Sequence, residues 1–83
     1  MPRKTIPEKV IRVHRRDDGR YVSRNEIPAD SPLGVDGSLS QALGTAKREA
    51  TLVSREGFRV RIEVLDGGGK WREIDVVQPP AAR

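Results

Sequence analysis

Few side chains in this chain have the types and spacing that catalysis or metal binding requires. His14 is the only histidine, and it lies in an alternating, arginine-rich stretch with no acidic residue at an obvious partner spacing. A lone histidine can act as a general base, but this context is more typical of a solvated strand residue. Asp17 and Asp18 could contribute oxygen ligands to a metal ion, yet no third acid accompanies them and Gly19 follows directly. Turn formation therefore explains the pair better than metal binding.

The serines and the glycine run also lack the surroundings of a reactive site. Ser38, Ser40 and Ser54 show no nucleophile-elbow pattern, so helix capping or surface placement accounts for them. The three glycines at 67–69 could suggest a phosphate-binding loop, but a P-loop continues with Lys-Ser or Lys-Thr and a helix. Here a Lys-Trp pair leads into a predicted strand, which favours a hairpin tip. The sequence thus predicts no catalytic, cofactor-binding or metal-binding residue and no enzymatic activity.

The positive charge of the chain is concentrated in its first third. The whole sequence carries a formal net charge of +4, and residues 1–24 contain eight Lys or Arg against three acidic residues. A basic excess of this kind can attract nucleic acid or another polyanion. The alternative is the ordinary charged surface of a soluble protein. The basic residues of this segment are Arg3, Lys4, Lys9, Arg12, Arg15, Arg16, Arg20 and Arg24.

Length and composition predict one small cytoplasmic domain. The 83 residues suit a single domain near the lower size limit for folding on one core. Cysteine is absent, which excludes disulfides and thiolate metal sites and fits a cytoplasmic protein. The first nine residues contain two prolines and no apolar stretch, unlike a signal peptide. No segment approaches the roughly 20 apolar residues of a membrane span, so we expect no membrane partner.

The clearest structural signal is a hairpin spanning residues 58–77. Phe58, Val60, Ile62 and Val64 alternate with charged residues, a pattern that predicts a strand with one buried face. A three-residue loop at 67–69 gives a register with apolar pairs on one face and an opposite-charge pair on the other. This register pairs Ile62 with Ile74, Val60 with Val76, Arg61 with Asp75, Glu63 with Glu73, and Leu65 with Trp71.

A second hairpin is predicted over residues 10–25. Strands at 10–15 and 21–25 flank an Asp-Gly pair, which favours a two-residue turn. With that turn, Ile11, Val13 and Val22 share the buried face. A three-residue loop ending at Gly19 would shift the pairing by one residue and separate these side chains, so we prefer the two-residue turn.

Residues 26–37 hold two prolines and two glycines without periodicity, and we expect a connecting loop there. A helix follows, with Ser38 as N-cap, Gln41 at the capping-box position and Gly57 as the left-handed residue after the last turn. Gly44 lies inside this helix, where its missing side chain would permit close contact with the sheet. The apolar stripe of the helix comprises Leu39, Ala42, Leu43, Ala46, Ala50 and Val53.

Three short segments in order resemble a family of short bacterial domains of unknown function. They are residues 18–22 (Asp-Gly-Arg-Tyr-Val), residues 47–57 (from Lys-Arg-Glu-Ala to Arg-Glu-Gly) and residues 64–67 (Val-Leu-Asp-Gly). The resemblance covers roughly residues 10–77 and implies a hairpin–helix–hairpin layout. The chain departs from the family in its Pro-containing segment before the helix and in its triple glycine. The resemblance implies no activity for any residue.

These elements predict an α+β domain of ββαββ order, in which two antiparallel β-hairpins form a sheet with one α-helix packed on one face. We expect the domain at residues 10–77, a flexible arm at residues 1–9 and a disordered tail at residues 78–83. The predicted core comprises Ile11, Val13, Val22, Leu39, Leu43, Ala46, Val53, Phe58, Val60, Ile62, Ile74 and Val76.

The outer face of this predicted sheet is the candidate binding surface. It gathers Arg12, His14, Tyr21, Arg59, Arg61, Leu65 and Trp71. An exposed Trp71 could serve a homodimer, contact another protein or pack against the N-terminal arm. The leading hypothesis is a non-catalytic binding or assembly module that acts through this face or a sheet edge. The alternative is a nucleic-acid-binding protein, because aromatics among arginines can stack bases and contact phosphates.

Overall fold

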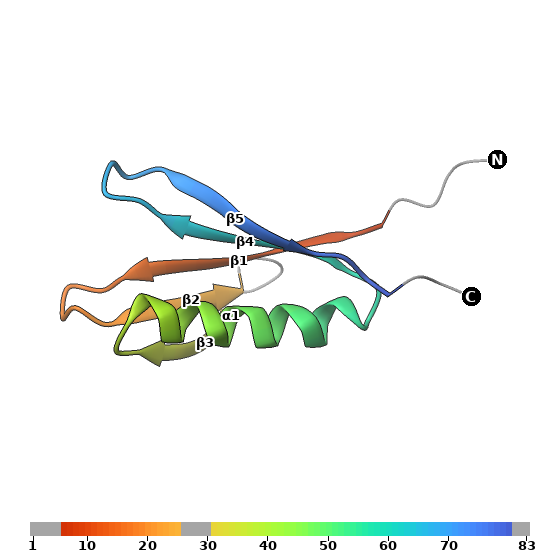
Figure 1. The fold of residues 1–83 in the computed structure, drawn as a ribbon, viewed down its shortest axis with the longest axis horizontal. Helices are drawn as coiled ribbons and strands as arrows, with labels where there is room; N and C mark the ends of the chain where they lie inside the picture. The colour runs from red at the N-terminus through yellow and green to blue at the C-terminus, as the bar shows by residue number, and fades with distance from the viewer. Residues whose placement is uncertain (1–5, 26–30, 81–83) are drawn as a thin grey trace.

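One helix packs against one face of a five-stranded sheet (Figure 1). The computed structural model describes residues 6–25 and 31–80. The elements are β1 (Glu8–Arg15), β2 (Tyr21–Asn25), β3 (Ser31–Asp36), α1 (Leu39–Ser54), β4 (Arg59–Leu65) and β5 (Trp71–Val77). The strand order is β3-β2-β1-β4-β5, and every neighbouring pair is antiparallel except β1 and β4, which are parallel.

The predicted α+β class, the single helix and the shared sheet are confirmed. The predicted ββαββ order is only partly right, because a third strand precedes the helix and the two hairpins meet through a parallel pair. Parallel neighbours need a long crossover, here supplied by β2, β3 and α1. Of the predicted arm and tail, residues 1–5 and 81–83 lie outside the described residues, while Glu8 and Lys9 belong to β1.

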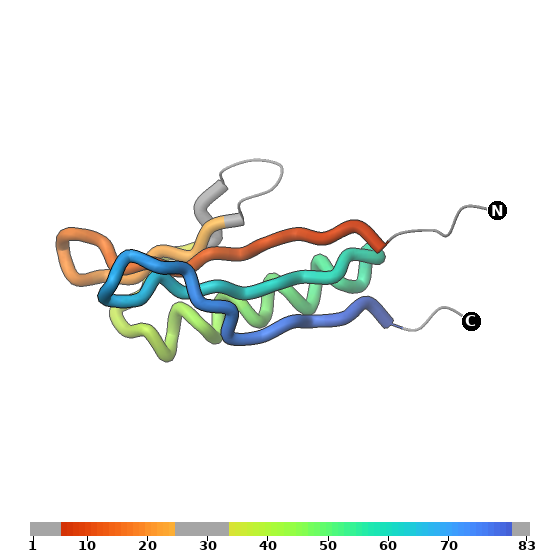
Figure 2. The backbone as a smooth tube through the Cα atoms, turned by 90° about the horizontal axis from the view of Figure 1, so that it is seen from above, coloured from red at the N-terminus to blue at the C-terminus, as the bar shows by residue number. Residues whose placement is uncertain are grey.

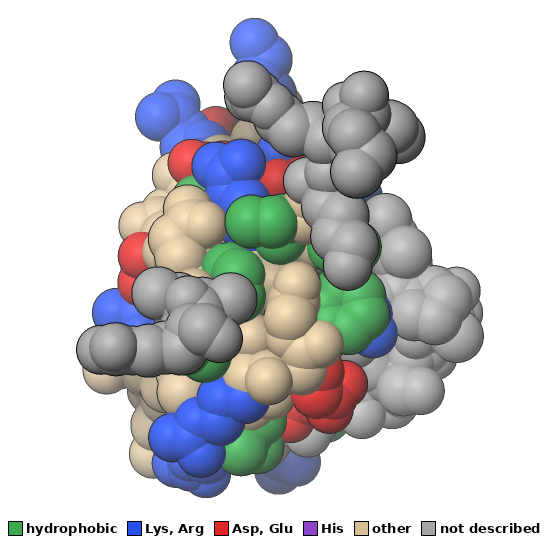
Figure 3. Space-filling view, turned by 90° about the vertical axis from the view of Figure 1, so that its right-hand side faces the viewer, with side chains coloured by type: hydrophobic (Ala, Val, Ile, Leu, Met, Phe, Trp, Pro, Cys, Tyr) green, Lys and Arg blue, Asp and Glu red, His purple; other side chains and the backbone are tan. Residues whose placement is uncertain are grey.

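The turns of the two hairpins lie at the same end of the molecule, and β1 and β4 begin at the opposite end (Figures 1 and 2). At that opposite end, basic, acidic and hydrophobic side chains are mixed on the surface (Figure 3).

The core lies where α1 covers the central parallel pair. Ile11 and Val13 of β1 stand beside Ile62 and Val64 of β4. The helix faces them with small residues, since Ala42, Ala46 and Ala50 are fully buried, and Val53 extends the same stripe. Small side chains allow the helix to approach the sheet closely, so the β-branched residues of the strands fill the space between the layers. Tyr21, Leu43, Phe58, Val64 and Val77 are half-buried against this cluster.

The helix boundaries agree with the sequence pattern, but two expectations within the helix are wrong. Ser38 is the N-cap, and its Oγ accepts a hydrogen bond of 3.2 Å from the Gln41 amide. Gly57 has a φ of 101°, as its position after the last turn requires. Leu39, however, is 37% exposed and outside the core. Gly44 faces open space, because a Cβ built there would meet no atom within 4 Å.

The β1–β2 hairpin adopts the register that we expected it to avoid. Val13 lies opposite Ser23 and His14 opposite Val22, so Val22 is on the outer face and not beside Ile11 and Val13. The loop is Asp17 to Gly19, closed by a hydrogen bond of 3.0 Å from the Gly19 amide to the Arg16 carbonyl, and Gly19 has a φ of 87°. A three-residue loop with a left-handed glycine is a common hairpin solution.

Ser23 takes the buried position opposite Val13, which the two-residue turn would have assigned to Arg24. Its side chain is 0% exposed, and its Oγ donates a hydrogen bond of 3.2 Å to the Ala42 carbonyl of α1. A buried hydroxyl with a partner costs little. A serine can therefore occupy the tight space beneath the helix.

Part of the segment expected to be a loop forms the edge strand β3. Residues 26–30 lie outside the described residues, but Ser31–Asp36 pairs with β2, with a register shift beside Ser23 and Arg24. Pro32 is compatible with an edge strand, where a missing backbone donor need not interrupt a ladder. Asp36 anchors the strand end, because its Oδ2 accepts a hydrogen bond of 3.0 Å from Thr45 of α1.

The β4–β5 hairpin follows the predicted register near its turn and departs from it further on. Leu65 lies opposite Trp71 and Glu63 opposite Glu73, as expected. The register then shifts by one residue between Ile62 and Glu63. Ile62 faces Asp75, Arg61 faces Val76, and Val60 faces Val77.

The predicted pairs of Ile62 with Ile74, Val60 with Val76 and Arg61 with Asp75 are therefore wrong. Ile74 is 44% exposed and not in the core. Val77 packs against the core cluster in the place where Val76 was expected. Val76 itself is half-buried. A one-residue bulge of this kind moves each following side chain of β5 to the other face.

Candidate functional site

The face of the sheet opposite α1, here called the outer face, carries most of the residues singled out from the sequence. Strand registers place Arg12, His14, Arg59, Arg61, Leu65 and Trp71 on it. Tyr21 lies on the helix side and packs against the core, because the β1–β2 register differs from the expected one. The outer face therefore holds six of the seven candidates, and they do not form one uniform surface.

The part of the outer face formed by β1, β4 and β5, here called the ion-pair half, has its arginines matched by acids. Arg12 Nε donates a hydrogen bond of 2.9 Å to Glu63 Oε1. Arg61 lies between Glu8, at 3.3 Å, and Glu63, at 3.2 Å. Arg59 approaches Glu8 at 3.8 Å. Three arginines thus share acidic partners, and they leave little net charge to attract a polyanion.

Trp71 is engaged within the protein. The guanidinium carbon of Arg12 lies 4.5 Å from the centroid of the Trp71 ring. A guanidinium over an indole face is a favourable cation–π arrangement. The same Arg12 side chain therefore contacts Glu63 and covers Trp71, which reduces the ring surface that a ligand could stack on.

The outer side of the β1–β2 hairpin, here called the basic half, has a different charge pattern. Residues of even number point outward in this register, and five of them are basic. These are Arg12, His14, Arg16, Arg20 and Arg24. Arg12 and Arg24 are directly opposite each other. Like charges in opposed positions destabilise a sheet, so the pattern works against folding and invites a functional explanation.

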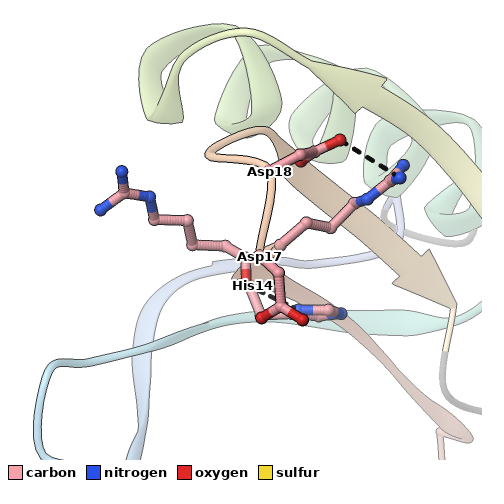
Figure 4. A pocket seen from close by; sticks show the side chains of 5 residues that line it. His14, Asp17 and Asp18 are labelled. Carbon is pink, nitrogen blue, oxygen red and sulfur yellow. Dashed lines mark hydrogen bonds and ion pairs between the residues drawn. The ribbon is translucent and has the colours of Figure 1, made fainter.

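Within the described part of the chain, two of the four arginines of the basic half have an acidic partner, and one of these is Arg12, which binds Glu63. Asp18 pairs with Arg16 at 3.3 Å at the hairpin tip, where both side chains are largely exposed (Figure 4). Asp36 lies on the helix side, where it binds Thr45. Among residues 6–25 and 31–80, no acid lies within 4 Å of the Arg20 or Arg24 guanidinium.

A hollow of about 430 Å³ opens on the basic half. Its lining combines His14, Arg16 and Arg24 with Val22 and Val35. Val22 is buried and Val35 is 43% exposed, and the two lie opposite each other on β2 and β3. A second hollow of about 460 Å³ at the tip shares His14 and Arg16 and extends to Asp17 and Asp18 (Figure 4). The arrangement is an apolar patch bordered by two arginines and a histidine.

The described residues offer no constellation for catalysis or metal binding. In residues 6–25 and 31–80, no group of three His, Asp or Glu side chains could hold a metal ion. His14 Nδ1 is 3.4 Å from the Arg15 carbonyl, and among the described residues no carboxylate lies within 4 Å of its ring nitrogens to orient it for proton transfer. Within the same residues, no helix has the length and apolar character needed to cross a membrane.

Sequence reasoning missed the valines and three arginines of this surface. Val35 was assigned to a loop and Val22 to the core, while Arg16, Arg20 and Arg24 were counted only as general basic charge. The available signal was the even spacing of the basic residues. A three-residue turn pairs even-numbered residues of one strand with even-numbered residues of the other. All five basic residues have even numbers, so they then lie on the same face of the hairpin.

Comparisons with models of protein families, with curated proteins and with solved structures found no match to this chain.

Proposed function

We propose that this protein is a non-catalytic binding module that acts through the sheet face opposite α1, with an anionic partner on the basic half. The carrying observation is the placement of Arg12, His14, Arg16, Arg20 and Arg24 on one side of the β1–β2 hairpin. The proposal is supported by the contrast with the ion-pair half, where each arginine has an acidic neighbour.

An anionic partner would compensate the positive charges of Arg20 and Arg24, for which the described residues provide no acid within 4 Å. Arg12 and Arg24 oppose each other, and Arg16 and Arg20 pair at the base of the turn, with 2.6 Å between the Arg16 amide nitrogen and the Arg20 carbonyl oxygen. Guanidinium groups bind carboxylates and phosphates in planar, charge-assisted pairs. A ligand with several negative charges would bridge these side chains and stabilise the hairpin it binds.

Retention on immobilised heparin, a polyanion without bases, tests the proposal. We expect Arg24→Ala and Arg16→Ala to elute at lower salt than the parent protein, because each removes one cation from the basic half. Arg48→Ala is the matched control, since it removes the same charge from an exposed position on the helix, outside the basic half. Equal shifts for all three variants would mean that only net charge matters and would contradict the proposal.

Self-association through β5 is a second candidate function. β5 is the last strand of the sheet order, and Ile74 is exposed at its register shift. Edge strands with free backbone groups invite pairing with another chain. An antiparallel pairing of two β5 strands about an axis between Glu73 and Ile74 would set Arg72 of each copy opposite Asp75 of the other. Such a symmetric dimer is the commonest form of soluble homo-oligomer.

A further inference from the structure

We infer that the partner of the basic half is single-stranded nucleic acid, with phosphates on the alternate cations and a base on Val22 and Val35. This inference rests on the proposed function and names its ligand class.

The spacing of the cations suits an extended phosphate backbone. Alternate residues of a strand are about 6.6 Å apart, and neighbouring strands are about 4.8 Å apart. Arg12 and His14 lie on β1 with Arg16 directly after it, and Arg24 lies on β2 with Arg20 directly before it. A row of cations along a groove is the usual means by which proteins follow a single strand without reading its sequence.

The hollow supplies a contact that a simple polyanion does not need. Val22 and Val35 line the hollow between Arg16, Arg24 and His14, and the volume of about 430 Å³ lies within the roughly 300–1,000 Å³ typical of small-ligand pockets. A flat base can cover the exposed apolar surface of Val35 there, beside the buried Val22. Planar guanidinium and imidazole groups at the rim, from Arg16, Arg24 and His14, can stack on the base or contact its phosphate.

The shape of the surface favours a single strand over a duplex. Duplex readers insert a helix or a free two-stranded ribbon into the major groove. Here α1 packs on the opposite face, and the β1–β2 hairpin is flanked by β3 and β4 within one sheet. A duplex would present only its phosphates to this face, whereas a single strand can also place an unpaired base on the valines.

Fluorescence anisotropy with labelled 12-nucleotide probes tests the inference. The probes are single-stranded DNA, single-stranded RNA and duplex DNA, and heparin retention is measured on the same variants. We expect both single-stranded probes to bind more tightly than the duplex. Comparison of the RNA and DNA single strands shows which sugar the protein prefers. Log affinity should fall linearly with log salt concentration, and Arg24→Ala should reduce the slope by about 0.7 for one lost phosphate contact.

Val35→Ser separates the inference from the proposed function. Val35 is exposed, so this variant should fold normally, which a urea unfolding curve verifies. We expect about fivefold weaker binding of single strands, because the variant removes apolar surface that the base would cover, and unchanged retention on heparin. Val35→Ser without effect on single strands, or tighter binding of the duplex, would overturn the inference while heparin retention still supported the proposed function. Failure to bind heparin and every probe at low salt would overturn both.

Discussion

Arg12 joins two parts of the outer face, with its Nε 2.9 Å from Glu63 Oε1 and its guanidinium 4.5 Å from the centre of the Trp71 ring. Glu63 stands directly beside Arg12 on the parallel neighbour β4, and Trp71 comes from the edge strand β5. One arginine at the border of the two halves is thus held in place by a carboxylate and an aromatic ring. The tryptophan that the sequence offered as a ligand-stacking residue has a structural partner.

A double-mutant cycle measures this relationship. Arg12→Ala and Trp71→Ala should show a coupling in unfolding free energy of about 0.5–1 kcal/mol, as expected for a partly exposed cation–π pair. Oligonucleotide affinity should fall less in Trp71→Ala than in Arg24→Ala, because the ring contacts Arg12 and lies outside the hollow. Additive stability effects, or a larger binding loss in Trp71→Ala, would contradict the assigned role of Trp71.

The register of the β1–β2 hairpin predicts different roles for two serines. Ser23→Ala removes a buried hydrogen bond to the Ala42 carbonyl and should lower the free energy of unfolding by about 1 kcal/mol. Ser40→Ala, at an exposed position of α1, should change it by less than about 0.5 kcal/mol. Urea unfolding compares the two variants. In the alternative register Ser23 would face outward, and both changes would have equally small effects.

Gly44 and Gly57 should respond in opposite directions to the same substitution. Gly44→Ala should stabilise the protein by about 0.5–1 kcal/mol, because alanine favours the helix interior and its Cβ would contact nothing within 4 Å. Gly57→Ala should destabilise it, because the φ of 101° is unfavourable for a residue with a Cβ. Thermal unfolding gives both signs. A destabilised Gly44→Ala variant would indicate that the helix contacts a neighbour at this position.

The contacts of Asp66 in the β4–β5 turn predict that the stability of the protein depends on pH. Its carboxylate accepts hydrogen bonds from the Arg72 guanidinium (2.7 Å) and from the backbone amides of Lys70 (3.0 Å) and Gly68 (2.8 Å). These contacts, with Arg72 first, lower the pKa of Asp66 below its ordinary value of 3.8. The folded chain thus holds the proton less readily than the unfolded chain. The stabilisation is complete above pH 3.8 and is lost as the pH falls through the lower folded value.

Urea unfolding at several pH values tests this dependence. Asp66→Asn should be less stable than the parent protein at neutral pH, and the difference should shrink as the pH falls below 3.8. Asp17→Asn provides the control, since it removes an exposed acid of the other hairpin and should leave stability near that of the parent. A difference between Asp66→Asn and the parent that is constant with pH would show that charge at this position does not stabilise the turn.

Sedimentation measures the proposed pairing of β5 edges. We expect dimers at about 0.1 mM protein, a concentration well above the micromolar Kd that even weak interfaces of standard size reach. Ile74→Lys should restore the monomer, because an edge lysine opposes strand pairing. Arg48→Lys, an exposed helix change that keeps the charge, should leave the dimer intact. A parent protein that sediments as a monomer would eliminate this second function.

The sequence by itself determined the helix and the strands on either side of the final turn. Ser38 supplies a cap, Gly57 supplies a left-handed residue, and the alanines between them recur at helical spacing, so local interactions alone specify α1. The alternation from Val60 to Val64 similarly specifies β4, and the glycine-rich turn sets the first pairs of its hairpin. These signals depend on neighbours along the chain, which a sequence displays directly.

Only the tertiary structure decided which strands are neighbours and which residues share a face. Strand β3 forms because β2 offers it an edge, although Pro32 and Gly34 make its own sequence a poor strand. Ser23 turns inward because the Ala42 carbonyl of α1 accepts its hydroxyl, and that choice sends Val22 outward into the basic half. Glu63 neutralises Arg12 because β1 and β4 run parallel across 51 residues of chain. A one-residue change of register moves every side chain of a strand to the opposite face, and its cost depends on contacts from distant elements that local sequence does not encode.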